Sequence, residues 1–354
     1  MDSSTRQKRR TTIKDVARES GVSTQTVSRV LNERPDVSVE TRQRVQEVMR
    51  RLDYHPNALA RSLIQQRSYT LGVIIAGLKY VGVSQTLNGI ADQAEAEGYS
   101  LLLKELPRFD MEDVQPVIRS LLARDVEGII YAAPQWQGSH QAIQASLGDP
   151  CPPIIFLKGE PGAAYPSISI DNYAGACKAV RHLLDQGRRR IAHISGPLEW
   201  WEAEQRLFGW RDALQGAGLP GDPAHWRSGN WSSASGEKAF LELLESYPEM
   251  DAVFAANDQM ALGLLHAAHQ RGIRVPEQLA VVGFDDLAEA AFFSPALTTV
   301  RQDLRTLGTL AVRKVLQLAC SGERPDEEAL LPDQIVLDPE LVIRASSLLS
   351  PVVG

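Results

Sequence analysis

TTIKDVARESGVSTQTVSRVLN, residues 11–32, is the stretch that decides the architecture of the start of the chain. Thr12 is a favourable N-cap for a helix over Ile13–Ser20, and Gly21 supplies the break that ends it. Ser23 then caps a second helix over Thr24–Asn32. The sequence therefore predicts two short helices joined by a tight, glycine-containing turn.

A third helix, opened by Ser38, completes this region. Its Val45, Val48, Met49 and Leu52 recur at helical spacing and form a stripe that can cover the first two helices. Two short helices joined in this way are typical of a helix-turn-helix, whose second helix presents its N-terminal residues to base edges in the major groove. An ordinary three-helix bundle is the alternative.

The outward face of the second helix favours DNA binding, because its side chains form hydrogen bonds. Gln25 can bond adenine and Arg29 guanine, while hydroxyl groups can contact phosphates. Charge agrees: residues 1–61 carry 13 Lys+Arg against 8 Asp+Glu, which leaves 24 against 36 for the rest of the chain. A basic head on an acidic body suits a protein that meets a polyanion with one small region.

From Thr70 onward, short apolar runs alternate with helical patterns. LGVIIAG, EGIIYAA, PPIIFL, RRIAHIS, DAVFAA and LAVVGF are the clearest expected strands. This βαβ rhythm predicts parallel sheets covered by helices. The number of strands favours two doubly wound lobes, with ligands expected at the carboxyl ends of the strands and between the lobes. The predicted fold class is α/β, with a small all-α helix-turn-helix headpiece.

Residues 11–32, together with DYHPNALARSL at 53–63, resemble the headpiece of the lactose-repressor (LacI/GalR) family. The resemblance implies a headpiece over residues 1–55 and a hinge helix with linker over 56–68. Leu63 would insert into the minor groove. Thr24 and Asp36 depart from the family pattern, so the operator sequence stays undetermined. The implied DNA contacts are Thr12, Ser23, Thr24, Gln25, Thr26, Ser28, Arg29, Asn32, Tyr54, Asn57, Ala60 and Leu63.

The body resembles the same family through GPLEWWEAEQRLFGW (196–210), GNWS (229–232), FAANDQMALG (254–263), VVGFDDL (281–287) and SPALTTVRQDLRTLG (294–308). The resemblance implies the periplasmic-binding-protein type I fold over residues 69–347. The N-lobe would hold about 69–170 plus 304–331, and the C-lobe about 171–303 plus 332–347. The implied ligand-binding residues are Arg206, Trp231, Asn257, Asp285, Gln302, Trp201, Glu202 and Lys158.

These residue types suit a sugar. Charged and amide groups bond hydroxyls, and a flat indole such as that of Trp231 stacks on the apolar face of a pyranose. Each also has a structural alternative: Arg206 as a surface charge, Asn257 as a cap, Asp285 as a loop acid. Glu204 and Lys158 differ in charge from the lactose-binding pattern. We therefore expect a different ligand, a β-glycoside or a disaccharide.

Several functional classes are disfavoured. Cys151, Cys177 and Cys320 fit neither a disulfide framework nor a metal site, so we expect a reducing cytoplasm and no cofactor or metal. The N-terminus lacks an export signal and no apolar run reaches membrane-spanning length. A sugar-transport component and a sugar-metabolising enzyme are the alternative functions, although no nucleotide or nucleophile motif is present. The chain lacks a leucine-heptad tail after ELVIRASS, so we expect a homodimer on palindromic DNA.

Overall fold

The computed structural model describes residues 11–31, 34–54, 67–106, 114–133, 143, 151–158, 165–319 and 331–348. The chain divides into two compact units, Met1–Ser68 and Tyr69–Gly354, here called the headpiece and the body. Among the described residues, no helix is both long and apolar enough to span a bilayer.

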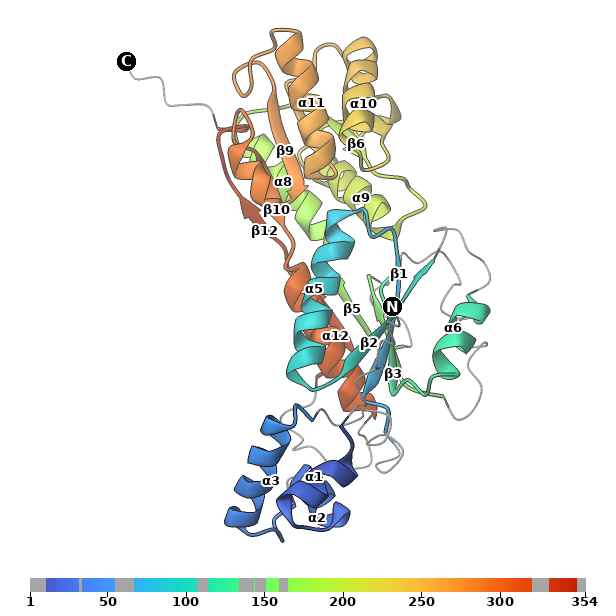
Figure 1. The fold of residues 1–354 in the computed structure, drawn as a ribbon. Coiled ribbons are helices and arrows are strands. Elements are labelled where there is room, and N and C mark those ends of the chain that lie inside the picture. The colour runs from blue at the N-terminus through green and yellow to red at the C-terminus, as the bar shows by residue number, and fades with distance from the viewer. Residues whose placement is uncertain are drawn as a thin grey trace, which may run out of the picture. The chain divides into compact units, whose positions relative to one another are not determined.

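The headpiece consists of the three helices expected from its sequence, α1 (Ile13–Ser20), α2 (Thr24–Leu31) and α3 (Val39–Arg51) (Figure 1). The Asp15 carboxylate accepts the backbone N–H of Thr12 at 3.0 Å. Ser23 accepts the N–H of Thr26 at 3.1 Å, which caps α2. Gly21 adopts φ 66°, the left-handed conformation that ends α1.

The core of the headpiece is small and made almost entirely of valine. It joins the three helices through the buried side chains of Val16, Ala17, Val27, Val30, Val45 and Val48. Met49 and Leu52 pack against this cluster, as the helical spacing predicts. The polar face of α2 is consequently left on the surface.

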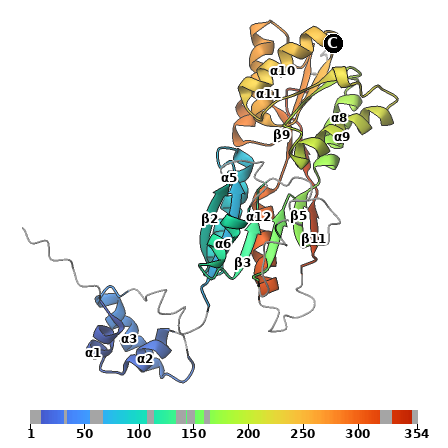
Figure 2. The ribbon, with the colours of Figure 1, turned by 90° about the vertical axis from the view of Figure 1, so that its right-hand side faces the viewer.

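The first lobe of the body is a parallel sheet in the order β11-β5-β4-β3-β1-β2, as far as the described residues extend. Helices α5 and α12 cover one face and α6 the other, as Figure 2 shows. The elements are β1 (Thr70–Ala76), α5 (Val81–Ala96), β2 (Ser100–Leu106), α6 (Gln115–Leu122), β3 (Gly128–Tyr131), β4 (Ile154–Leu157), β5 (Ser167–Ile170), α12 (Leu304–Ala319) and β11 (Gln334–Leu337).

The second lobe is a sheet in the order β12-β10-β9-β8-β6-β7 over the described part of the chain, parallel except where β12 pairs with β10. Its elements are α8 (Asn172–Asp185), β6 (Ile191–Ser195), α9 (Trp201–Gly216), η1 (Pro223–His225), β7 (Trp226–Ser228), α10 (Ser233–Ser246), β8 (Ala252–Ala255), α11 (Asp258–Gln270), β9 (Ala280–Asp285), η2 (Ala288–Phe292), β10 (Thr298–Arg301) and β12 (Glu340–Val342).

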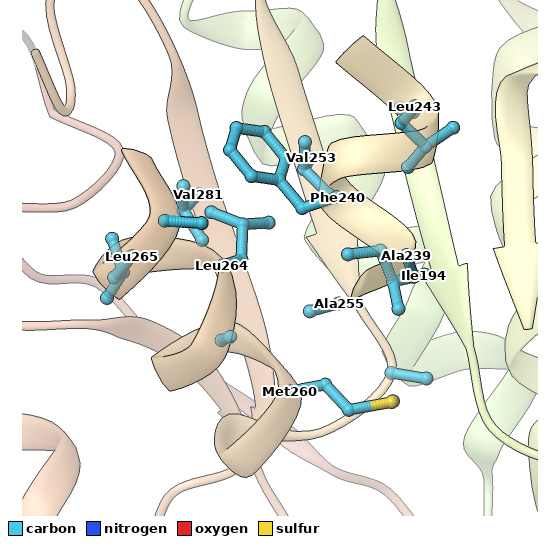
Figure 3. Packing of buried hydrophobic residues seen from close by; sticks show 14 of the residues in the cluster. Ile194, Ala239, Phe240, Leu243, Val253, Ala255, Met260, Leu264, Leu265 and Val281 are labelled. Carbon is cyan, nitrogen blue, oxygen red and sulfur yellow. The ribbon is translucent and has the colours of Figure 1, made fainter. Parts of the chain in front are cut away.

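Both faces of the second sheet are covered. On one face Phe240 and Leu243 of α10 meet Met260 and Leu264 of α11 over the sheet residue Val253 (Figure 3). Helices α8 and α9 pack on the other face. Strands buried on both faces explain the continuous apolar runs in the sequence.

The chain passes between the lobes after β5, after β10 and after β11 within the described ranges. The first two passages lie where the sequence analysis divided the lobes. The third does not, because the expected C-lobe segment 332–347 is split. Strand β11 pairs in parallel with β5 of the first sheet, with Ile335 opposite Ile168, and only β12 joins the second sheet. A short apolar strand carries no local signal of which sheet it joins.

Candidate nucleic-acid interface and ligand pocket

The outward face of α2 presents the polar side chains that the helix-turn-helix prediction requires. Ser23, Thr24, Gln25 and Arg29 are exposed, whereas Thr26 and Ser28 are half-buried. Thr26 belongs to the α2 cap, because its hydroxyl lies 3.0 Å from that of Ser23. The hydroxyl and amide groups lie at the N-terminus of α2 and the Arg29 guanidinium lies in its last turn, and this exposed array is suited to reading base edges and phosphates.

The other expected DNA contacts are distributed more widely. Thr12 is exposed before α1, while Tyr54 is half-buried after α3 and packs against the valine core. Burial raises the pKa of Tyr54. Asn32, Asn57, Ala60 and Leu63 lie outside the described residues.

A pocket with an empty volume of about 600 Å³, part of it open to solvent, lies between the two lobes of the body. Its walls are formed where strands end and the following loops or helices begin, as expected for doubly wound sheets. It is lined by Tyr80, Val81, Gly82, Val83, Lys158, Ile170, Asn172, Trp200, Glu202, Arg206, Trp231, Asn257, Gln259, Asp285, Gln302 and Leu304.

Arg206 is the most constrained charged group of the pocket. Its Nε donates to Asn172 Oδ1 at 2.8 Å, and its Nη1 donates to the carbonyl of Ala256. The same Nη1 lies 3.8 Å from Asp285 Oδ1, and the guanidinium stacks 3.8 Å from the ring centroid of Phe284. The Arg206 side chain is 5% exposed, which rules out the alternative of a surface charge.

Asp285 ends β9 at φ 118°, an unusual backbone conformation for a residue other than glycine. Gln302 Nε2 donates to its Oδ1 at 2.5 Å. Burial raises the pKa of Asp285 and lowers that of Arg206, although the opposite charge of each partner counteracts the shift in the other. The pair therefore forms a fixed arrangement of donors and acceptors before any ligand arrives.

The pocket contains a second ion pair. Unlike the pair of Arg206 with Asp285, it joins the two lobes. Lys158, which follows β4, places its Nζ 3.7 Å from Glu202 Oε1 in the first turn of α9. The side chains are 12% and 7% exposed. Glu202 Oε2 is buried and has no hydrogen-bond partner among the described residues. An unsatisfied buried carboxylate oxygen is costly, so this atom offers an acceptor to a ligand hydroxyl.

Aromatic rings form the apolar wall. Trp231 lies so close to Gly196 that a Cβ on that glycine would meet the indole at 2.2 Å. The ring centroids of Trp231 and Trp200 are 5.7 Å apart, and Tyr80 contacts Trp200 edge-on at 5.5 Å. Trp231 Nε1 has no partner in the described part of the chain. The wall thus combines flat apolar surface with a buried N–H donor that has no partner among the described residues.

Asn257 has a structural role as well as a place in the pocket wall. Its Oδ1 accepts the N–H of Met260 at 2.9 Å, which caps α11, as the structural alternative predicted. Its Nδ2 donates to the carbonyl of Trp231 at 3.0 Å and to Gln259 at 2.6 Å. The Asn257 side chain therefore fixes the backbone of the residue that carries the indole.

Seven of the eight expected ligand-binding residues line this pocket, and Trp201 does not. Trp201 is half-buried at the start of α9, whereas Trp200, its N-cap, faces the pocket. Glu202 and Arg206 are four residues apart and share a helix face, from which Trp201 is rotated by about 100°. Trp200, and not the expected Trp201, therefore lines this pocket.

Tyr80, Asn172 and Gln259 are lining residues that the sequence analysis did not select. Asn172 lies two residues after the end of β5, and Tyr80 lies four residues after the end of β1. The rule that ligands lie beyond the carboxyl ends of parallel strands could have identified both.

Asp258 lies behind the pocket wall and is fully buried. Its Oδ1 accepts the hydroxyl of Thr299 at 2.6 Å and its Oδ2 accepts the N–H of Leu287 at 2.8 Å. Burial, followed by the nearby charge of Asp285, raises the pKa of Asp258 to about 8. This carboxyl group therefore holds the β9 loop that carries Asp285, largely in its protonated form at neutral pH.

Comparison with known proteins finds a matching family for each of the two units. Residues 12–57 match the family described as bacterial regulatory proteins, lacI family, and residues 180–347 match a periplasmic binding protein-like domain. The chain is 34% identical over 325 residues to the lactose operon repressor of Escherichia coli (strain K12), which covers 92% of this chain and 89% of that protein.

Two solved structures extend the comparison. The lac repressor dimer bound to operator and the anti-inducer ONPF superposes with a TM-score of 0.86 at 33% identity, covering 96% of this chain and 100% of that one. The transcriptional regulator CelR in complex with cellobiose has a TM-score of 0.69 at 29% identity, covering 95% and 100%. Both span the headpiece and the body.

Proposed function

The chain belongs to the LacI family of bacterial DNA-binding regulators, and on this premise we propose that it represses carbohydrate-utilisation genes under the control of a sugar bound between its lobes. As a member of this family it is a transcription regulator and not an enzyme. Membership also supports the expected cytoplasmic location, since the DNA that bacterial regulators bind lies there.

The observation that carries the sugar proposal is the charge pattern of the pocket. Lys158 faces Glu202, and Arg206 faces Asp285, so the ionised groups of the wall form two oppositely charged pairs. Such pairs offer charge-assisted hydrogen bonds to hydroxyls without an excess of either charge. Trp231 supplies the flat apolar surface for a pyranose ring. A phosphorylated or otherwise anionic ligand would need an unpaired cation. Lys158 and Arg206 are the cations of the wall, and each is already paired with a carboxylate.

We expect the ligand to be a β-glycoside or a disaccharide. A second aromatic pair, Trp200 with Tyr80, lies beside Trp231 and can hold a second ring. The similarity to the CelR–cellobiose complex supports this ligand class.

Regulation of DNA affinity requires that the sugar favours one arrangement of the lobes. We propose a homodimer on a palindromic operator, a proposal supported by the similarity to a dimeric repressor bound to operator. Leu63 in the linker would insert between base steps and kink the DNA. Leu63→Ala should then lower operator affinity and reduce the difference between sugar-bound and sugar-free protein.

A ligand screen tests the proposal directly. Thermal shift of the full chain against neutral mono- and disaccharides should identify hits, since a ligand at a hundredfold its Kd stabilises the protein by about 2.7 kcal/mol. Each hit is then added to protein bound to DNA selected from a random duplex library. Asp285→Asn should abolish the sugar response and leave DNA binding intact. A panel without any hit would contradict the sugar proposal.

A further inference from the structure

The headpiece holds an ion pair beside the reading face of α2. Arg29 Nη1 lies 3.4 Å from Asp36 Oδ2, and the two side chains are 50% and 54% exposed. We propose that Asp36 determines operator specificity by orienting Arg29 toward a guanine and by weakening binding where no guanine is present. This inference rests on the proposed role of Arg29 in reading DNA.

The backbone on either side of Asp36 is anchored, at Arg34 and at Ser38. The N–H of Arg34 donates to the carbonyl of Arg29 at 3.0 Å. The guanidinium of Arg42, on α3, donates to the carbonyl of Arg34 at 2.6 Å. Ser38 caps α3 two residues after Asp36. The backbone anchors therefore keep Asp36 close to the outward face of α2, where its carboxylate meets Arg29.

The geometry leaves Arg29 able to read a base while it is paired. A guanidinium has five N–H donors in a planar fork, and the contact with Asp36 involves Nη1. Donors on the other edge remain to engage the O6 and N7 of guanine in a bidentate pair. An exposed ion pair contributes little to folding, so the effect of this contact lies in restricting the rotamers of a long side chain.

The carboxylate also has a cost that depends on DNA sequence. A negative charge near the major groove reduces the attraction of this face to the phosphates, and opposite a guanine this loss is offset by the bidentate contact that the oriented guanidinium makes. Opposite another base Arg29 stays paired with Asp36 and gains no base contact, so only the loss remains. Asp36 should thus weaken binding to arbitrary DNA more than binding to the operator.

The test is selection of operators by the full chain from a palindromic random duplex library, followed by sequencing of bound DNA. The position read by Arg29 is the one whose guanine preference disappears in Arg29→Ala. In Asp36→Asn we expect that preference to fall about fivefold or more, and affinity for a random-sequence duplex to rise about twofold to tenfold. An unchanged guanine preference in Asp36→Asn would overturn the proposal.

Glu47→Gln is the matched control, because Glu47 is an exposed acid of the headpiece paired with Arg50 on α3 at 2.5 Å. It changes net charge equally and should leave base preferences unaltered. If Glu47→Gln relaxed the guanine preference as much as Asp36→Asn, general charge would explain the effect and the orienting role would be wrong.

The double variant separates orientation from direct reading. With Arg29→Ala already present, Asp36→Asn should change no base preference further. A further change would mean that Asp36 contacts a base itself, for example the amino group of cytosine, and would overturn the proposal. If the unaltered protein enriches no motif, the DNA-reading role of the headpiece fails instead.

Discussion

Arg29 of the headpiece and Arg206 of the body are the same residue type in opposite environments. Arg29 is half exposed and held by one ion pair at 3.4 Å, whereas Arg206 is 5% exposed and fixed by Asn172 at 2.8 Å, by the Ala256 carbonyl and by Asp285. A DNA-reading group must stay accessible to a large partner, but a group that binds a small ligand can be preorganised inside the protein. Removing the charged side chain should therefore change folding stability far more in the body than in the headpiece.

The largest effect is expected for Arg206→Ala. This change leaves the buried Asp285 without its ion-pair partner, which should lower the free energy of unfolding of the body by about 3–5 kcal/mol and abolish the sugar response. Urea unfolding followed by tryptophan fluorescence reports on the body alone, since every tryptophan lies between residues 136 and 231. Arg181→Ala, an exposed arginine on α8, is the control and should unfold like the unaltered protein.

A second test of the buried charges uses pH. Folding raises the pKa of Asp258 from 3.8 to about 8, so the folded state binds its proton more tightly than the unfolded state does. The resulting stability is complete below pH 4 and is lost as pH rises toward 8, by at most about 1.4 kcal/mol per pH unit.

Asp258→Asn should remove this contribution, because an amide can donate to Thr299 and still accept the N–H of Leu287. Urea unfolding at pH 5, 6, 7 and 8 should show a shallower decline in the variant, with the raised pKa of Asp285 accounting for part of what remains. Asp185→Asn changes an exposed acid on α8 and should keep the original slope. Equal slopes in the unaltered protein and Asp258→Asn would mean that Asp258 is ionised at neutral pH.

An intermediate effect, on ligand affinity, is expected for the interlobe pair of Lys158 with Glu202. If Glu202 Oε2 accepts a ligand hydroxyl, Glu202→Gln should weaken binding of the best sugar by about 1.5–3 kcal/mol, the usual contribution of a hydrogen bond to a charged group. Glu204→Gln lies on the same helix outside the pocket wall and should bind the sugar normally. Isothermal titration of both variants compares them, and equal affinities would remove Glu202 from the ligand contacts.

The smallest effect on folding is expected for Arg29→Ala. Its surface pair should contribute less than about 0.5 kcal/mol to the stability of the headpiece. Specific DNA binding should nevertheless weaken by about 1–3 kcal/mol while sugar affinity stays unchanged. Fluorescence anisotropy with selected and random duplexes measures the difference. An equal loss of affinity for the selected and the random duplexes would show that Arg29 contacts phosphate only. Arg29 and Arg206 would then differ in burial but not in the kind of recognition they provide.

The sequence by itself was sufficient for features that depend on neighbours along the chain. The caps at Thr12, Ser23 and Ser38 and the break at Gly21 set the three headpiece helices, because each acts within one helical turn. The alternation of strands and helices predicted parallel sheets. Motif resemblance then indicated seven side chains that the fold brings to one pocket.

Tertiary structure alone decided what depends on residues far apart in sequence. Strand β11 joins the first sheet by pairing with β5, which lies far away in the sequence, and no local pattern specifies that partner. Trp200 rather than Trp201 reaches the pocket because the start of α9 fixes which face Glu202 and Arg206 share. The pairing of Lys158 with Glu202 exists only because the lobes bring together the ends of elements 44 residues apart. Local propensity acts through adjacent backbone groups, whereas these contacts require the packed fold.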